Sequence, residues 1–268
     1  MNNYLAAYGL KTIPFNITSD PDFFYRSSTH KEVLSTLIFG LRQKKGLMAV
    51  IGEVGTGKTT LCKVFLNHLP KEVKTSVIFS SPQFSQTQLL KNILDDFGLK
   101  RERKNRFDLI KNLNSFLIDT SLSGGNALLV IDEAQNLTPK QLEQIRLLSN
   151  LETSREKLLQ ILLVGQPELE DKLNNFKLRQ IKQRIGIKCR LLPLREDEIK
   201  QYIQYRIDKA GVSILSIEPE CYKIIYQFSQ GIPRLINLLC ERVLLLGFVQ
   251  EKNQINPSML KVCIEELQ

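Results

Sequence analysis

A glycine-rich stretch between an apolar run and a helical pattern constrains the fold of this chain most. The stretch from Gly52 reads GEVGTGKTT, and the apolar residues 47–51 precede it. Glycine permits backbone torsions and close approaches that a side chain blocks, so successive N–H groups can face phosphate oxygens at a helix start. A chance glycine-rich turn lacks this order of strand, loop and helix. The sequence therefore predicts an α/β protein that binds a nucleotide.

Each residue of the loop has an expected task. Lys58 reaches the β- and γ-phosphates, and the Thr59 hydroxyl ligates Mg²⁺. The ligands we expect are therefore ATP and Mg²⁺. The residues predicted to contact the nucleotide are Gly52, Glu53, Val54, Gly55, Thr56, Gly57, Lys58, Thr59 and Thr60.

Two acidic residues follow a second apolar run. Asp132 and Glu133 come directly after residues 127–131, which are all apolar. A continuous apolar run indicates a buried parallel strand, and ligands gather at the carboxyl ends of such strands. Alone, the acids could simply mark a strand that ends in solvent. With the phosphate loop upstream, Asp132 is predicted to support Mg²⁺ and Glu133 to polarise the attacking water of an ATPase.

Alternating strand and helix patterns predict a parallel sheet covered on both faces. The predicted strands are 47–51, 75–79, 127–131, 160–164 and 187–192. The strand at 75–79 separates the loop from the acids, and Glu133 adjoins Asp132, which favours the additional-strand class of phosphate-loop ATPases. Residues 138–141 form a capping box that opens a helix. After Pro193 only helical patterns remain, at 196–210, 219–230, 233–248 and 257–266. We therefore expect a nucleotide-binding core at 1–192 and a helical lid at 193–268.

Composition limits the compartment and the partners. No stretch approaches the ~20 apolar residues that span a bilayer, and the first ten residues lack the features of a secretory signal. The five cysteines are scattered, which predicts reduced core residues in a cytoplasmic protein. The net charge of +9 leaves a polyanionic partner such as DNA open. Two basic stretches, 100–106 and 172–190, fit either a binding patch or a solvated surface.

Three further residues are candidates for sensing the nucleotide or acting between subunits. Gln166 follows the strand at 160–164, where it can bond the attacking water or the γ-phosphate; a simple turn contact is the alternative. Arg184, and second Arg179, can reach the nucleotide of a neighbouring subunit and neutralise charge in the transition state. Solvated arginines on a helix surface are the alternative there.

The segments at the start of the chain and of the predicted lid also bear on the nucleotide. In Gly231-Ile232-Pro233-Arg234, Arg234 opens a lid helix and can bend back over the phosphates. The segment 1–28 is rich in aromatics and prolines. It can pack near adenine between core and lid, or it can fill a hydrophobic groove.

Together these residues make the chain resemble the ExeA/GspA family of AAA+ ATPases, associated with type II secretion, and the related MshM-type pilus-biogenesis ATPases. The stretches that carry the resemblance are Tyr8-Gly9-Leu10, Pro14-Phe15, the run from Asp20 to His30, GEVGTGKTT, residues 130–137, 147–153 and 163–169, Gln183-Arg184-Ile185 and residues 231–237. It covers nearly the whole chain, and 150–153 and 165–169 are its most specific parts.

The resemblance implies a homo-oligomeric ATPase, in a ring or filament, whose nucleotide state acts on the assembly of an envelope machine. It further implies a secretion or pilus protein as partner, at the inner face of the cytoplasmic membrane. Longer family members carry a membrane span and a peptidoglycan-binding region after the ATPase portion, so a free-standing protein and the cytosolic part of a longer one both fit. The same architecture is similar to AAA+ regulators of transposition that bind DNA with ATP. A nucleotide-gated scaffold with little turnover is a third alternative.

Overall fold

The computed structural model describes residues 3–99, 105–154, 156–212 and 214–267. Of the basic stretch at 100–106, residues 100–104 lie outside this part. The described residues divide into two compact units. We call residues 32–52 and 65–191 the sheet unit, and residues 1–31, 53–64 and 192–268 the helical unit. The predicted division at 192/193 into core and lid stays a prediction.

The sheet unit is built on five parallel strands in the order β2-β3-β4-β1-β5. Strand β4 lies between β1 and β3, as the additional-strand class requires, so both the five-stranded sheet and its class are confirmed. All five predicted strands are present, each within two residues of its expected bounds. The strands are β1 (Leu47–Gly52), β2 (Val73–Phe79), β3 (Asn126–Asp132), β4 (Leu159–Gly165) and β5 (Ile185–Leu191).

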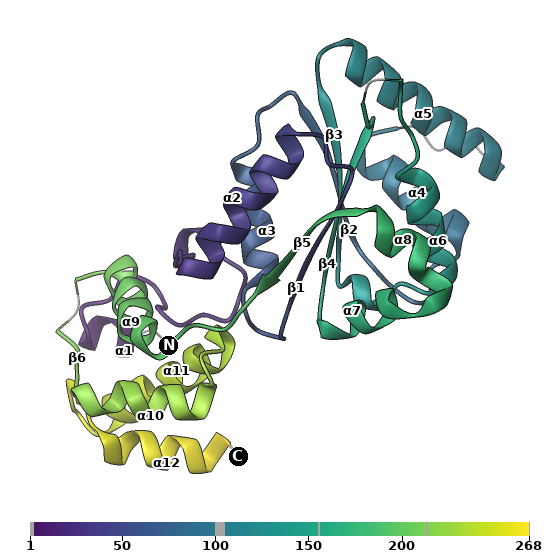
Figure 1. Ribbon diagram of the computed structural model, residues 1–268. Helices are drawn as coiled ribbons and strands as arrows, with labels where there is room; N and C mark the ends of the chain where they lie inside the picture. Colours follow the sequence, from purple (N-terminus) through teal and green to yellow (C-terminus); the bar gives the residue numbers. More distant parts are fainter. Residues whose placement is uncertain (1–2, 100–104, 155, 213, 268) are drawn as a thin grey trace. The chain divides into compact units, whose positions relative to one another are not determined.

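Helices cover both faces of this sheet because its central strands are apolar on both sides (Figure 1). Alternate residues such as Ala49, Leu129 and Ile161 pack into one core with helices α4 to α8. On the other face, α2 lies so close that a Cβ on Gly40 would be 2.6 Å from Met48 Sδ. The helices are α2 (Ser28–Arg42), α4 (Gln86–Asp96), α5 (Arg106–Leu122), α6 (Pro139–Leu148), α7 (Pro167–Asn174) and α8 (Arg179–Arg184).

Local signals in the sequence end and begin these helices. Thr138 and Gln141 form the predicted capping box of α6, with Pro139 at its first turn. Gly98 has a φ of 78° just after α4, the left-handed conformation that ends many helices. Because the sheet is parallel, β1, β3 and β4 all end at one edge, at Gly52, Asp132 and Gly165. Ligands of open α/β sheets collect at this carboxyl edge.

The helical unit packs around its own apolar core. Its helices are α1 (Asn3–Ala7), α9 (Glu196–Ala210), α10 (Pro219–Ser229), α11 (Pro233–Val249) and α12 (Pro257–Leu267), together with the first residues of α3 (Lys58–Asn67) and the 3-10 turn η1 (Pro21–Phe23). Tyr8 and Phe15 from the N-terminal segment are buried in this core. These two aromatic side chains therefore act as core residues.

The prediction that only helices follow Pro193 was wrong in one detail. Ser216–Ile217 and Gln254–Ile255 pair as the short parallel strands β6 and β7. Two residues are too few to produce a recognisable alternation, so the sequence pattern gave no sign of them.

All five cysteines are free thiols, and four of them are buried, as expected for core residues; Cys189 is the exception and is only partly buried. None of the described helices is long and apolar enough to cross a membrane.

Candidate nucleotide-binding site

The phosphate loop belongs to the helical unit, and hydrogen bonds to one of its own backbone carbonyls stabilise its shape. The Glu53 carbonyl accepts hydrogen bonds from the Thr56 hydroxyl at 2.8 Å and from Lys58 Nζ at 2.9 Å. Gly55 and Gly57 have φ values of 81° and 92°, which favour glycine. The loop runs directly into α3, which begins at Lys58. A cation, positive-φ glycines and the N-terminus of a ten-residue helix make a donor set that fits phosphate oxygens.

His30 supports the loop from the end of the N-terminal segment. Its Nε2 lies 3.2 Å from the Thr56 carbonyl oxygen, and its Nδ1 lies 2.6 Å from Ser27 Oγ. A Cβ on Gly57 would be 3.3 Å from Nε2, so the imidazole limits the space beside the loop. The ring is buried, and burial lowers the pKa of His30 to about 4, although the Thr56 carbonyl and Glu198 act in the opposite direction. His30 therefore supports the loop as a neutral imidazole at physiological pH.

Glu198 of α9 fixes the start of α2 next to His30. Its carboxylate accepts hydrogen bonds from the backbone N–H and the hydroxyl of Ser28, at 2.9 and 3.0 Å, and from the Arg195 N–H at 3.1 Å. Burial raises the pKa of Glu198, but these hydrogen bonds and the charge of Arg195 together leave the pKa below its ordinary value. The helix start that carries His30 is thereby tied to α9.

The first turn of α11 contacts the loop through Arg234. The Arg234 N–H donates to the Gly55 carbonyl at 3.2 Å. A Cβ on Gly55 would be only 2.7 Å from Arg234 Cβ and 3.0 Å from Ile232 Cγ2. Arg234 opens α11 as predicted, and its side chain is exposed. The structure thus brings the predicted loop and the predicted lid motif together within the helical unit.

The acidic residues lie at the carboxyl edge of the sheet unit. Asp132 is the buried last residue of β3, and its Oδ1 accepts the Glu133 N–H at 2.8 Å. Glu133 has a φ of 53°, an uncommon left-handed conformation for a residue with a side chain. The Ser80 hydroxyl donates to the Glu133 carbonyl at 2.5 Å. The turn places a half-buried carboxylate after the strand.

Gln166, predicted from the end of β4, contacts this carboxylate directly. Its Nε2 donates to Glu133 Oε2 at 3.1 Å, across the 33 residues that separate them in sequence. Gln135 Nε2 donates to the same oxygen at 2.5 Å, and Gln135 Oε1 accepts the Gln166 N–H at 3.1 Å. Gln135 was not predicted as a site residue. Its sequence signals are its position two residues after the predicted water-polarising acid and its place in the stretch 130–137 that carries the family resemblance.

The two candidate arginines lie on α8. Arg184 is the last residue of this helix and directly precedes β5, and its side chain is exposed. Arg179 stacks over the Phe176 ring, with its guanidinium carbon 4.5 Å from the ring centroid. In the basic stretch 172–190, Lys188 and Arg190 both pair with Glu170, at 2.6 and 2.8 Å. Both arginine side chains are exposed, and action of either on a neighbouring subunit stays a prediction.

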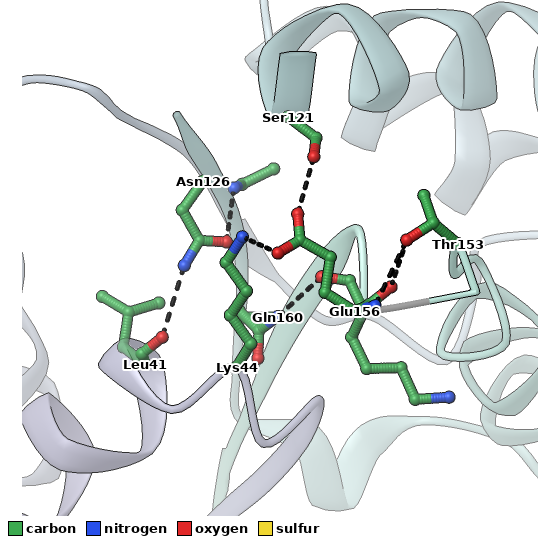
Figure 2. Close-up of polar contacts among 9 residues, drawn as sticks. Leu41, Lys44, Ser121, Asn126, Thr153, Glu156 and Gln160 are labelled. Carbon is green, nitrogen blue, oxygen red and sulfur yellow. Dashed lines mark hydrogen bonds and ion pairs between the residues drawn. The ribbon is translucent and has the colours of Figure 1, made fainter. Parts of the chain in front are cut away.

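A second polar cluster lies at the opposite edge of the sheet, where β3 and β4 begin (Figure 2). Lys44 Nζ pairs with Glu156 Oε2 at 2.6 Å, and the Ser121 hydroxyl donates to Glu156 Oε1 at 2.7 Å. Asn126 Nδ2 donates to the Leu41 carbonyl at 3.3 Å. An open cavity of about 790 Å³ borders the cluster. These contacts join α2, α5 and the loop before β4, so the cluster has a structural role.

Comparisons with known proteins agree with this fold and these motifs. Residues 41–173 match the family model described as an AAA domain. The chain is 39% identical over 256 residues to General secretion pathway protein A of Aeromonas hydrophila, covering 94% of this chain and 46% of that protein. The chain thus spans about half the length of the curated relative it matches.

Solved structures show the same fold at low sequence identity. The ADP form of the Aeropyrum pernix ORC2 protein has a TM-score of 0.69 at 16% identity, covering 94% of this chain and 72% of that chain. Cdc6p from Pyrobaculum aerophilum has a TM-score of 0.66 at 17% identity, covering 92% and 71%. The Thermotoga maritima RuvB motor has a TM-score of 0.59 at 21% identity, covering 89% and 68%.

The chain therefore has the AAA+ fold, the class of phosphate-loop proteins that the sheet order and the loop define. Within that class it is a GspA-like AAA domain protein, and the predicted family is confirmed.

Proposed function

We propose that this protein binds Mg-ATP and hydrolyses it, and that the cycle controls its self-association and the assembly of a secretion- or pilus-type envelope machine. The observation that carries the ATPase proposal is the Glu133 carboxylate, held by Gln166 at the same sheet edge from which the phosphate loop departs. The secretion context rests on the similarity to General secretion pathway protein A. This role belongs on the cytoplasmic side of the membrane.

Within this proposal each residue has one task. Lys58 and the loop N–H groups would bind the phosphates, while Thr59 and Asp132 would hold Mg²⁺, a hard cation that prefers oxygen ligands. The metal neutralises phosphate charge when it is bound. Glu133 accepts a proton from the attacking water, Gln166 orients that water or the γ-phosphate, and Arg234 reports nucleotide binding to the lid at 193–268. The chemistry is positioning and charge neutralisation, without a covalent intermediate.

Two substitutions separate binding from turnover. Lys58→Ala removes the loop cation, so Mg-ATP binding should fall below detection. Glu133→Gln keeps the loop intact, so ATP should bind with parent affinity while phosphate release falls by at least about 100-fold. Isothermal titration and a phosphate-release assay measure both. Parent-rate hydrolysis by Glu133→Gln contradicts the water-polarising role, and a parent protein that binds ATP without turnover supports a nucleotide-gated scaffold.

Self-association and the DNA-binding alternative can be tested together. Lys177, Lys182 and Arg184 are exposed basic residues of the segment 177–184 in the sheet unit, in keeping with the net charge of +9. We expect larger particles with a non-hydrolysable ATP analogue than with ADP, measured by light scattering, and no change on adding duplex DNA. ATP-dependent duplex binding that weakens steeply with salt would instead support a DNA-binding regulator.

A further inference from the structure

We propose that Gln135 is a positioning residue that fixes the Glu133 carboxylate and couples it to Gln166. The inference rests on the proposed ATPase function and adds a residue to its machinery. Gln135 lies in the 3-10 turn η2 (Ala134–Asn136), directly after the acid that it holds. Its side-chain amide donates one hydrogen bond to Glu133 and accepts one from Gln166, so it links these two residues.

The orientation of this amide is set by its partners. The Gln166 backbone N–H can only donate, so the oxygen of the Gln135 amide must face it, at 3.1 Å. The nitrogen then faces the carboxylate of Glu133, which accepts at 2.5 Å. A glutamine side chain is long enough to reach both partners and carries both a donor and an acceptor. A glutamate would keep the acceptor and place a second carboxylate against Glu133, whereas a leucine would remove both bonds.

The surroundings of Gln135 are built to hold it in place. A Cβ on Gly165 would lie 3.1 Å from Gln135 Oε1 and 2.8 Å from Leu169 Cδ2, so the glycine leaves the space that the amide needs. Lys172 Nζ donates to the Gln135 carbonyl, and to the Leu137 carbonyl at 3.2 Å. The backbone of the turn is thereby tied to α7. Both the side chain and the main chain of Gln135 are fixed.

The same arrangement divides the two oxygens of Glu133 between two tasks. Oε2 accepts from both glutamine amides, whereas among the described residues Oε1 has no hydrogen-bond partner. One oxygen is thus immobilised while the other can meet a water molecule. A carboxylate that pivots freely loses alignment with its water, and misplacement by about 1 Å can cost about 100-fold in rate.

The kinetic test uses Gln135→Leu and Gln135→Glu, with Asn136→Ala as the control. Asn136 is exposed in the same turn, and its side chain forms no hydrogen bond with any described residue. We expect kcat to fall about 10- to 100-fold in both Gln135 variants with KM for ATP unchanged within about twofold, because the phosphate loop is untouched. Asn136→Ala should behave as the parent.

A double-mutant cycle tests whether Gln135 acts through Glu133. If it does, Gln135→Leu should add no loss of kcat in a Glu133→Gln background. An equal loss in both backgrounds, or a parent kcat in Gln135→Leu, would overturn the inference. So would a rise in KM as large as the fall in kcat.

A turnover-independent measurement keeps this inference separate from the ATPase proposal. Hydrogen exchange at the Gln166 amide, followed by NMR in nucleotide-free protein, should speed up at least about tenfold in Gln135→Leu and stay slow in Gln135→Glu, which retains the acceptor. Unchanged exchange in Gln135→Leu overturns the coupling even where hydrolysis is intact. A parent protein without hydrolysis contradicts the ATPase proposal alone, and the exchange result then still decides whether Gln135 holds Gln166.

Discussion

His30 illustrates how a single buried side chain can hold a functional loop. The imidazole lies between Ser27 and the Thr56 carbonyl, and the Phe24 ring meets it edge-on at a centroid distance of 5.0 Å. Burial disfavours the charged imidazolium, so His30 keeps its neutral form in the folded protein. A charge on this ring would have to be accommodated directly beside the phosphate loop.

Acid should therefore destabilise the protein through His30. The folded pKa of about 4 lies below the ordinary 6.5, so the unfolded chain takes up a proton first as the pH falls. The contribution of neutral His30 to the free energy of unfolding is fully present above pH 6.5. It is lost as the pH falls to 4, and the total loss is about 3 kcal/mol. Denaturant unfolding at pH 7 and pH 4.5 checks this, with His30→Gln as the comparison.

The His30→Gln variant should lose less unfolding free energy between these two pH values than the parent does. The comparison is needed because Glu198, whose pKa is lowered, also loses stabilisation as the pH falls and does so in both proteins. Equal losses in parent and variant would show that His30 does not carry the effect.

At the scale of elements, the contact between the phosphate loop and α11 depends on the absence of a side chain at Gly55. This residue needs a positive φ, and a Cβ there would also meet Arg234 Cβ. Gly98 has a similar φ of 78°, but a Cβ on it would have no atom within 4 Å. Comparing substitutions at the two glycines therefore separates the effect of backbone strain from the effect of steric contact with α11.

Gly55→Ala should weaken ATP binding at least about tenfold and destabilise the protein by about 2–4 kcal/mol, because a strained backbone and a displaced α11 act together. Gly98→Ala should cost only about 1–2 kcal/mol and leave ATP binding unchanged. Calorimetric binding and denaturant unfolding of both variants provide the measurement. Parent-like ATP binding by Gly55→Ala would mean that the loop tolerates movement of α11.

The elements also differ in how far their sequence reveals them. The five strands were predictable because long apolar runs fit a parallel sheet covered on both faces. The strands β6 and β7 have only two residues each, so no pattern marks them. Gln135 and His30 were not predicted as site residues because their roles depend on the left-handed turn at Glu133 and on a contact across 26 residues of sequence. Such juxtapositions exist only in the folded chain.

For the whole molecule, the exposed position of Arg184 at the end of α8 suits action on a neighbouring subunit. Arg184→Ala alone should lose most turnover at protein concentrations where subunits associate. Mixing it with Glu133→Gln subunits, which retain Arg184, should restore turnover, because the intact arginine then meets a site with an intact Glu133.

Lys182→Ala serves as the control for this mixing experiment, since Lys182 is an exposed cation of the same helix. It should keep parent turnover without mixing. Absence of restoration in mixtures that demonstrably form joint oligomers would place Arg184 outside the neighbour's site.

The hydrogen bond between Lys58 and the Glu53 carbonyl has a consequence for the whole reaction cycle. The lysine has a partner inside its own loop, so in the proposed ATPase phosphate binding would exchange a neutral acceptor for a charged one and would not have to order a loose side chain. On release of the product, the ammonium group would return to the Glu53 carbonyl. The proposed cycle therefore predicts that the loop keeps its shape through repeated binding and release of nucleotide.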